Sequence, residues 1–322
     1  MEFNLYPAQS EADLAFFNEE EYQSALENKI LLEDRSAEEA RKTYLGDLAG
    51  YLESLSNNQI IVAKSADGSY AGMIWLAERT SKELWDFSAF PAWIYDIRVR
   101  PEFRGNGLGR LLLKQAEAWA VSCGYQEIGL QVFGDNQTAI NLYQSSGYLT
   151  EYSYMQLDIS FENLPPLDGT LQFRPYLAEQ DHSITDQLLF QQYRQRAGAK
   201  ANLVVSAEEI TAGFRHCLEI YNFGNQKKEL IIVEHPTGEP VGVLWFYKSK
   251  GDLGRRRYIW LHAAQTADSG HLPQMLRYLE HWAADHQLDA IRTPIHQCEI
   301  NLIETLSSFN YQPANLFMLK KL

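Results

Sequence analysis

Apolar and polar positions alternate along this chain in short stretches with the two-residue period of strands and in longer stretches with the period of helices. In the first half, strand patterns lie at residues 3–6, 59–64, 70–78, 93–99, 127–133 and 148–159, and helical patterns lie within 11–55 and at about 107–121 and 138–146. In the second half, strand patterns lie at 171–176, 230–234, 240–247, 257–263, 290–296 and 316–319, and helical patterns lie within 181–218 and at 272–286 and 299–309. Because strands and helices are interspersed, the pattern predicts an α/β (α+β) fold in which each half has a mixed central sheet flanked by helices.

The same order of elements occurs twice, which suggests duplication of a whole domain. A stretch containing Pro, Gly and Asp at residues 163–169 is typical of a linker. We therefore expect one domain at residues 1–162 and a second at 170–322. The repeat is one of pattern more than of identity, as a comparison of residues 141–148 with 304–311 illustrates.

The composition indicates a soluble globular protein, since 45% of the 322 residues are hydrophobic and 22% are charged. A formal net charge of -14 argues against nucleic acid as the main partner. The charge is consistent with a charged surface that keeps the protein soluble, or with an acidic entrance to a binding site that attracts cationic amines. Three widely spaced cysteines, Cys123, Cys217 and Cys298, match no metal site and no disulfide framework. No signal peptide or membrane-spanning run is evident, so we expect a cytoplasmic protein without a membrane partner.

A glycine-rich stretch from Arg104 to Arg110 (RGNGLGR) follows one strand pattern and opens a helical pattern. Glycines let the backbone approach an anion, and the free N–H groups of the first helical turn favour negative charge. The stretch therefore predicts a phosphate site. A dinucleotide-binding fingerprint is disfavoured because no acidic residue follows about twenty residues later at the end of the next strand. A nucleoside-triphosphate loop is disfavoured because the Gly-Lys-Ser/Thr ending is missing.

The order of strand, Arg-x-x-Gly-x-Gly, helix, strand, Asn, and Leu-Tyr-x-x-x-Gly-Tyr resembles the GCN5-related N-acetyltransferase (GNAT) family over residues 93–148. The resemblance implies a tandem form of that family with acetyl-coenzyme A as co-substrate and no metal. In the family, the glycine turn holds the pyrophosphate and the preceding strand pairs with the pantetheine arm. The implied cofactor-binding residues here are Ile97, Arg98, Val99, Arg104, Gly105, Asn106, Gly107, Leu108, Gly109, Arg110 and Asn136.

The resemblance also implies direct attack of an amine on the thioester. The N–H of Ile97 would stabilise the oxyanion, and Tyr143 would protonate the leaving thiolate as the catalytic residue. Some family members carry a glutamate base at the position of Gln131, which cannot accept a proton. Asp96, Glu151 and a water-mediated route are the candidates that replace it.

Several of these residues have a structural interpretation as well. Tyr143 could be a packing tyrosine, and Asn136 could cap the helix that follows it. Four aromatic residues could line an acceptor pocket or belong to an ordinary core: Trp85, Phe87, Phe90 and Trp93.

The second half lacks the signature. Aligned on the helix that follows, Asp268 falls near the position of Arg104 and His271 near Gly107. A carboxylate there would repel a pyrophosphate, so we expect a GNAT-like domain without cofactor binding. His296 and Cys298 have no cofactor turn beside them, which favours structural roles.

These observations together predict an N-acetyltransferase that moves an acetyl group to a small-molecule or peptide amine. A sensor module that binds acyl-coenzyme A without turnover is the alternative, and transfer of a longer acyl chain is a third possibility. The acceptor and the oligomeric state cannot be derived, because acceptor loops differ most within a fold.

Overall fold

The computed structural model describes the whole chain except residues 28–35, 80–91, 163, 199–205, 222–227 and 250–256. The described residues fall into two compact units. The first unit contains residues 1–79, 92–151 and 316–322, and the second contains residues from 152 to 315.

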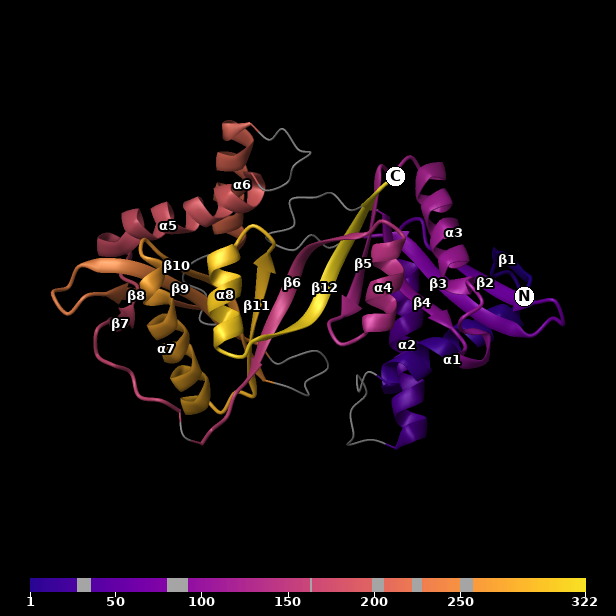
Figure 1. Cartoon of the computed structure of the whole chain (residues 1–322), viewed down its shortest axis with the longest axis horizontal. Helices are drawn as coiled ribbons and strands as arrows, with labels where there is room; N and C mark the ends of the chain where they lie inside the picture. The colour runs from indigo at the N-terminus through magenta and orange to yellow at the C-terminus, as the bar shows by residue number, and fades with distance from the viewer. Residues whose placement is uncertain (28–35, 80–91, 163, 199–205, 222–227, 250–256) are drawn as a thin grey trace. The chain divides into compact units, whose positions relative to one another are not determined.

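The described residues of the first half form the following strands and helices (Figure 1): β1 (Phe3–Pro7), α1 (Glu11–Glu27), α2 (Ala37–Ser54), β2 (Gln59–Ser65), β3 (Tyr70–Glu78), β4 (Ala92–Val99), α3 (Leu108–Ser122), β5 (Glu127–Phe133), α4 (Gln137–Ser145) and β6 (Leu149–Asp158). The second half repeats the order: β7 (Gln172–Pro175), α5 (Ala178–Gly198), α6 (Ala207–Tyr221), β8 (Lys228–Glu234), β9 (Pro240–Ser249), β10 (Tyr258–Thr266), α7 (Leu272–Asp285), β11 (Ala290–His296), α8 (Ile300–Ser308) and β12 (Gln312–Lys321). Most limits agree with the sequence pattern to within two residues, which confirms the predicted α/β class.

The two units have sheets of the same design. In the first unit, β1, β2, β3 and β4 are antiparallel neighbours, and β4 pairs with β5 in parallel. In the second unit, β7, β8, β9 and β10 are antiparallel neighbours, and β10 pairs with β11 in parallel. Each unit therefore has the mixed sheet that the sequence predicts.

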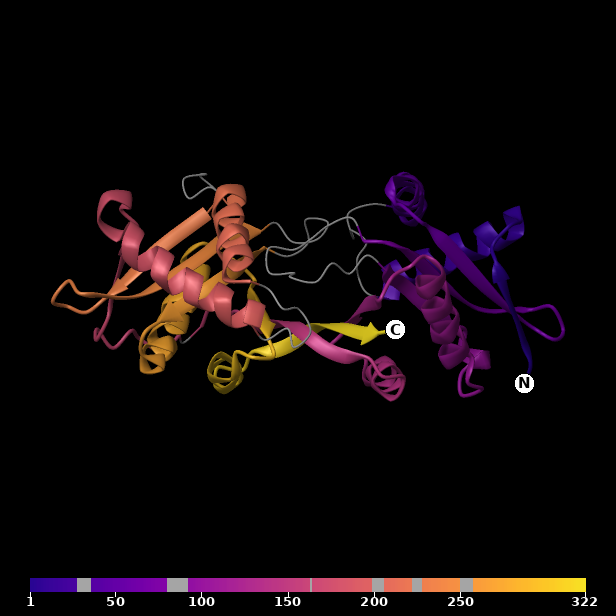
Figure 2. The ribbon, with the colours of Figure 1, turned by 90° about the horizontal axis from the view of Figure 1, so that it is seen from above.

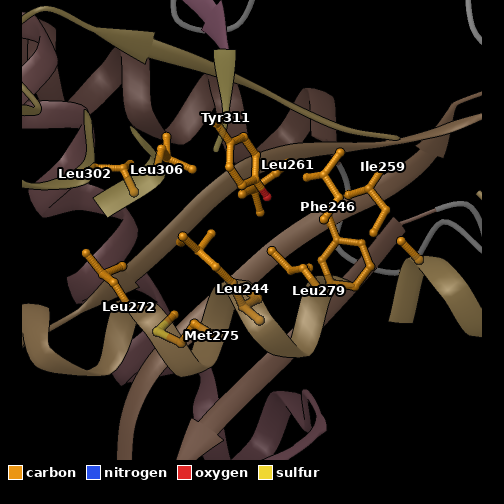
Figure 3. Close-up of a cluster of buried hydrophobic side chains, with 14 of the residues drawn as sticks. Leu244, Phe246, Ile259, Leu261, Leu272, Met275, Leu279, Leu302, Leu306 and Tyr311 are labelled. Carbon is orange, nitrogen blue, oxygen red and sulfur yellow. The ribbon is translucent and has the colours of Figure 1, made fainter. Parts of the chain in front are cut away.

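Helices cover both faces of each sheet because neighbouring strand residues point to opposite sides. In the first unit, Ile61 and Ala63 of β2 pack with α3 and α4, whereas Val62 between them packs with α1 and α2. In the second unit, Leu244 and Phe246 of β9 belong to the core under α7 and α8 (Figure 3). Val243 and Trp245, which alternate with them along β9, pack instead with residues of α5 and α6. These two helices lie on the other side of the sheet (Figure 2).

The strand that ends each half of the sequence is shared between the units. Residues 152–158 of β6 pair antiparallel with β11 in the second unit, where Tyr152 lies opposite His296. Residues 316–322, at the end of β12, belong to the first unit, where Met318 is buried in the core under α3. Lys320 forms an ion pair with Glu117 of α3 at 2.8 Å. Residues 152–158 and 316–322 therefore belong to other units than the domain limits expected from the sequence, 1–162 and 170–322, would give them. The reason is that a strand pattern carries no information on the strand with which it pairs.

Candidate active site

A turn with two left-handed glycines joins β4 to α3 in the first unit. Gly105 and Gly107 have φ angles of +78° and +80°, a conformation that other residues rarely adopt. A Cβ atom at either position would meet nothing within 4 Å, so the turn is open there. The backbone N–H groups from Gly105 to Gly109, including those of Asn106 and Leu108, donate to no acceptor within the described residues. Free N–H groups at the start of a helix can hold an anion.

Positive charge lies on both sides of this turn. Arg104 donates from Nε to the carbonyl oxygen of Val99 at 3.0 Å, and Arg110 donates to Oγ of Ser145 at 3.3 Å. The amide of Asn106 donates to two carbonyl oxygens of the same loop and closes it. Both arginines are exposed, so they can reach a ligand held at the turn.

Helix α4 packs closely against the first turn of α3. A Cβ atom on Gly109 would lie 2.9 Å from Cδ2 of Leu142 in α4, so glycine permits this approach. Asn136 caps α4, since its Oδ1 accepts the N–H of Ala139 at 3.1 Å. This confirms the capping interpretation of Asn136. Its contact with a cofactor stays a prediction.

A β-bulge separates β4 from β5 beyond their first paired residues. Trp75 of β3 lies opposite Asp96 and Leu76 lies opposite Ile94, so Tyr95 is an extra residue in β4. Among the described residues, β4 pairs with β5 only from Ala92 to Ile94. The bulge bends β4 at this point, and its later residues, including Ile97 and Val99, are left without a partner strand on the side of β5.

The N–H of Ile97 is not free in this arrangement. It donates to Oδ1 of the neighbouring Asp96 at 2.7 Å. The donor that the sequence predicts for an oxyanion is therefore occupied by a carboxylate in this structure. Arg98, the next residue, turns its side chain to α1, where it pairs with Glu20 at 3.3 Å and with Glu27 at 3.1 Å.

Tyr143 lies in α4 within the core under α3 and is 5% exposed. Burial, and to a lesser degree the charge of Asp96, raises the pKa of its phenol above the ordinary value. The phenol therefore stays protonated at neutral pH and can act as a proton donor.

Sequence reasoning missed one partner of Asp96. Glu21 of α1 is buried, and its carboxyl group is hydrogen-bonded to that of Asp96. The acidic stretch of α1 is unremarkable as a sequence, because charged residues on a helix are normally solvated. Only the placement of α1 beside β4 identifies Glu21.

The other candidates for the base and the acceptor pocket are less well placed. Gln131 of β5 is exposed, and Glu151 in β6 is half-buried. Trp93 is buried against Gly129 of β5, where an added Cβ atom would lie 2.5 Å from the indole ring, which indicates a packing role. Three aromatic residues of the proposed acceptor pocket lie outside the described residues: Trp85, Phe87 and Phe90.

The second unit has the corresponding bulged strand, turn and helices, but other residues at the positions of Asp96, the turn glycines and Tyr143. His262 is the extra residue in the bulge of β10, so Ala263 occupies the position that corresponds to Asp96. The turn at residues 267–271 contains no left-handed glycine and is shorter than the turn at 100–107. In α8, Leu306 corresponds to Tyr143, because each lies five residues before a buried tyrosine, Tyr311 or Tyr148.

A cavity of about 440 Å³ remains beside this second turn. Glu299 at its wall forms a buried ion pair with Arg196 at 2.9 Å and accepts a hydrogen bond from Gln192. His296 is buried and stacks on Tyr152, and Cys298 lies beside α5, with its Sγ 3.9 Å from the carbonyl oxygen of Gln195. These contacts are consistent with the structural roles that the sequence suggests for His296 and Cys298.

Within the described residues, no group of three or more His, Cys, Asp and Glu side chains could hold a metal ion. None of the described helices combines the length and apolar character that crossing a bilayer requires.

Comparison with known proteins gives a consistent result. The model of the acetyltransferase (GNAT) family matches residues 20–148. The uncharacterized N-acetyltransferase YdgE of Bacillus subtilis (strain 168) is 40% identical over 57 residues, which are 18% of this chain and 36% of that protein. Streptothricin acetyltransferase of Streptomyces lavendulae is 31% identical over 98 residues, 29% of this chain and 46% of that protein. The chain thus spans less than half the length of these curated relatives.

A solved structure is similar over almost the whole chain. The GCN5-related N-acetyltransferase from Sphaerobacter thermophilus has a TM-score of 0.53 and 13% sequence identity, and the likeness covers 99% of this chain and 95% of that chain. At this identity the likeness shows the fold, which both units of the present chain share.

Proposed function

We propose, from the premise that residues 20–148 belong to the acetyltransferase (GNAT) family, that the first unit transfers an acetyl group from acetyl-coenzyme A to an amine. The observation that carries this proposal is the open turn before α3, whose backbone N–H groups from Gly105 to Gly109 have no acceptor in the part of the chain that the structure describes. The pyrophosphate of the co-substrate supplies the missing acceptor.

Residues of the turn before α3, of β4 and of α4 each bind a different part of acetyl-coenzyme A. Gly105, Asn106, Gly107, Leu108 and Gly109 supply backbone N–H groups to the pyrophosphate, and Arg104 and Arg110 add positive charge. The edge of β4 from Ile97 to Val99, left unpaired by the bulge at Tyr95, receives the pantetheine arm. Asn136, at the start of α4, is the last of the residues that contact the co-substrate.

The reaction needs no covalent enzyme intermediate. The amine nitrogen attacks the thioester carbonyl carbon, the carbon–sulfur bond breaks, and the thiolate takes a proton from Tyr143. The raised pKa of Tyr143 keeps the phenol protonated at neutral pH, so that a proton is available to the thiolate. Positioning of the two substrates and backbone hydrogen bonds supply most of the rate.

Binding of acetyl-coenzyme A to a Gly107→Glu variant, measured by titration calorimetry, tests the proposal. The glutamate brings a side chain and a negative charge to the place of the pyrophosphate, so we expect binding to be lost. Gly68→Glu is the matched control, because Gly68 also has a positive φ, of +85°, and its Cβ would also meet open space, in the turn between β2 and β3. Loss of binding in both variants, or in neither, or no binding to the wild type, would refute the proposal.

Turnover is tested separately by release of thiol in the presence of polyamines, amino acids, aminoglycosides and lysine-containing peptides. Acetylation of any of these amines supports the enzyme. Binding of the co-substrate without turnover for any acceptor would favour a sensor module.

A further inference from the structure

Two buried carboxyl groups from separate elements meet beside the bulge of β4. Glu21 of α1 is 5% exposed, and its carboxyl group is hydrogen-bonded to that of Asp96. Oε1 of Glu21 and Oδ2 of Asp96 are both buried and have no hydrogen-bond donor among the described residues. Two ionised carboxylates in contact would repel strongly, and a proton held between them removes the repulsion and supplies the donor.

The surroundings of the pair come from four elements. Tyr44 of α2 donates to Glu21, and Ser24 of α1 and the N–H of Ile97 donate to Asp96. Arg98 is the nearby cation, but Glu20 and Glu27 of α1 already bind it. Tyr143 of α4 is near enough for the charge of Asp96 to raise the pKa of its phenol.

These partners favour one protonation pattern. Burial and the charge of Asp96 raise the pKa of Glu21 well above its ordinary value. Burial raises the pKa of Asp96 above its ordinary value as well, although Arg98 and the hydrogen bonds from Glu21 and Ile97 lower it, and the rise is larger for Glu21. The pair therefore carries one proton, mainly on Glu21, and one negative charge, mainly on Asp96.

We propose that Glu21 and Asp96 form a proton-sharing pair whose Asp96 accepts the proton of the acceptor amine, and whose single negative charge selects an acceptor that binds as a primary ammonium. This inference rests on the proposed function of the first unit and identifies its general base. Asp96 is the catalytic residue of the pair, and Glu21 is a positioning residue that acts through it.

The steps balance as follows. The ammonium group gives one proton to Asp96, and the neutral nitrogen attacks the thioester carbonyl carbon. The carbon–nitrogen bond forms, the carbon–sulfur bond breaks, and the thiolate takes a proton from Tyr143. The second proton of the nitrogen restores the phenol, and the proton on the pair passes to solvent. The products are an amide, coenzyme A and one proton.

The hydrogen bond from Ile97 to Asp96 couples base and oxyanion site. The N–H of Ile97 donates to Oδ1 of Asp96 while that carboxylate is charged. Once Asp96 takes up the proton of the amine, it becomes a weaker acceptor. The N–H is then available to the oxyanion at the step at which the oxyanion forms.

The second unit supports this assignment by contrast. Ala263 corresponds to Asp96 in the bulge of β10, and the turn before α7 has lost its glycines. The carboxyl pair and the anion-binding turn are thus present in the same unit and absent together from the described part of the other.

The test is the pH dependence of kcat/KM for any amine accepted in the thiol-release assay, measured on Asp96→Asn, Glu21→Gln and Glu19→Gln. Asp96→Asn should lose about 100-fold or more in rate near neutral pH and still bind acetyl-coenzyme A. Glu21→Gln removes the shared proton and leaves only an amide as donor to Asp96. An amide stabilises the charged form of Asp96 less than a carboxylic acid does, so the acidic limb of the profile should move to higher pH. Glu19→Gln removes an exposed charge of α1 that pairs with Arg41 and should leave the profile unchanged.

An unchanged rate in Asp96→Asn, or the same acidic limb in Glu21→Gln and the wild type, would overturn the proposal. A readout without turnover separates this result from failure of the proposed function. In protein labelled with carbon-13 at side-chain carboxyl groups, the wild type should show two carboxyl signals that titrate together, and Glu21→Gln should leave Asp96 with a single transition. Independent titration of the two groups would overturn the pair even if no acceptor is found.

Discussion

The carboxylate of Asp268 accepts a hydrogen bond from the backbone N–H of Gly270 at 2.9 Å, in the turn that precedes α7. A negative charge of the chain itself therefore occupies the place that stays open at Gly105 and Gly107 in the first unit. The turn between strand and helix is thus open to an anion in the first unit, whereas in the second unit the carboxylate of Asp268 already binds a backbone N–H of the turn.

This difference predicts one molecule of acetyl-coenzyme A per chain. Titration calorimetry should give a stoichiometry of one, and Gly107→Glu should remove it. Asp268→Asn should not add a second site, because the turn at 267–271 is also shorter and has no left-handed glycine. A stoichiometry of two in the wild type would contradict the assignment.

Replacement of Tyr143 by Phe should slow the chemical step and leave binding of acetyl-coenzyme A unchanged. In the reaction that we propose, the phenol supplies a proton to the leaving thiolate, so we expect kcat to fall by about 100-fold. Tyr148→Phe is the control, because the two rings lie 6.1 Å apart in the same core and the hydroxyl of Tyr148 is buried without a hydrogen bond among the described residues. Equal loss of kcat in both variants would show that Tyr143 acts through packing alone.

The buried pair of Arg196 and Glu299 should matter for the stability of the second unit. Their exposed fractions are 1% and 5%, and the guanidinium also donates to the carbonyl oxygen of Pro294. Arg196→Met leaves the charge of Glu299 uncompensated, and we expect the free energy of unfolding to fall by about 3–5 kcal/mol in urea titrations. The double variant with Glu299→Met should recover most of that loss, since it removes both charges. A double variant as unstable as Arg196→Met would point to packing instead.

Asp13, at the start of α1, should make stability depend on acid. Burial alone would raise the pKa of its carboxyl group, but hydrogen bonds from Tyr70, Ser10 and Gln9 outweigh burial and hold the pKa below its ordinary value. Its stabilising contribution is therefore complete above the unfolded-state pKa of about 3.9 and is lost as the pH falls through the lower pKa of the folded state.

Asp13→Asn tests this dependence. The variant should lower the free energy of unfolding by about 2 kcal/mol at neutral pH, with a difference that shrinks below about pH 4. Asp47→Asn is the control, because Asp47 is exposed on α2. A difference for Asp13→Asn that is constant from neutral pH to acid would contradict the role of the charge.

Much of the local structure follows from the sequence. The limits of β3 and β5 and the position of the turn before α3 were predicted from periodicity and glycines, and the structure confirms them. Such features depend on residues close together in the chain, whose φ angles and apolar spacing constrain the backbone directly.

The pairing of distant segments was not predictable in this way. The end of β12 joins the first unit, and residues 152–158 of β6 join the second, although both segments read as ordinary strands. A strand pattern shows which side chains are buried but not which edge the strand joins.

The residues of the candidate site also fall into those that a local sequence motif identifies and those that only the tertiary structure identifies. Arg104 to Arg110, Asn136 and Tyr143 stand out in the sequence because each belongs to a local motif, whereas Glu21 does not. Its meeting with Asp96 requires α1 to pack on the bulged part of β4, where Oε1 of Glu21 and Oδ2 of Asp96 are buried. The sequence by itself determined the position of the glycine turn for which we propose an anion, because that property depends on a short segment. Only the tertiary structure decided which carboxylate has a proton-sharing partner, because that property arises from burial and from contact between elements far apart in the chain.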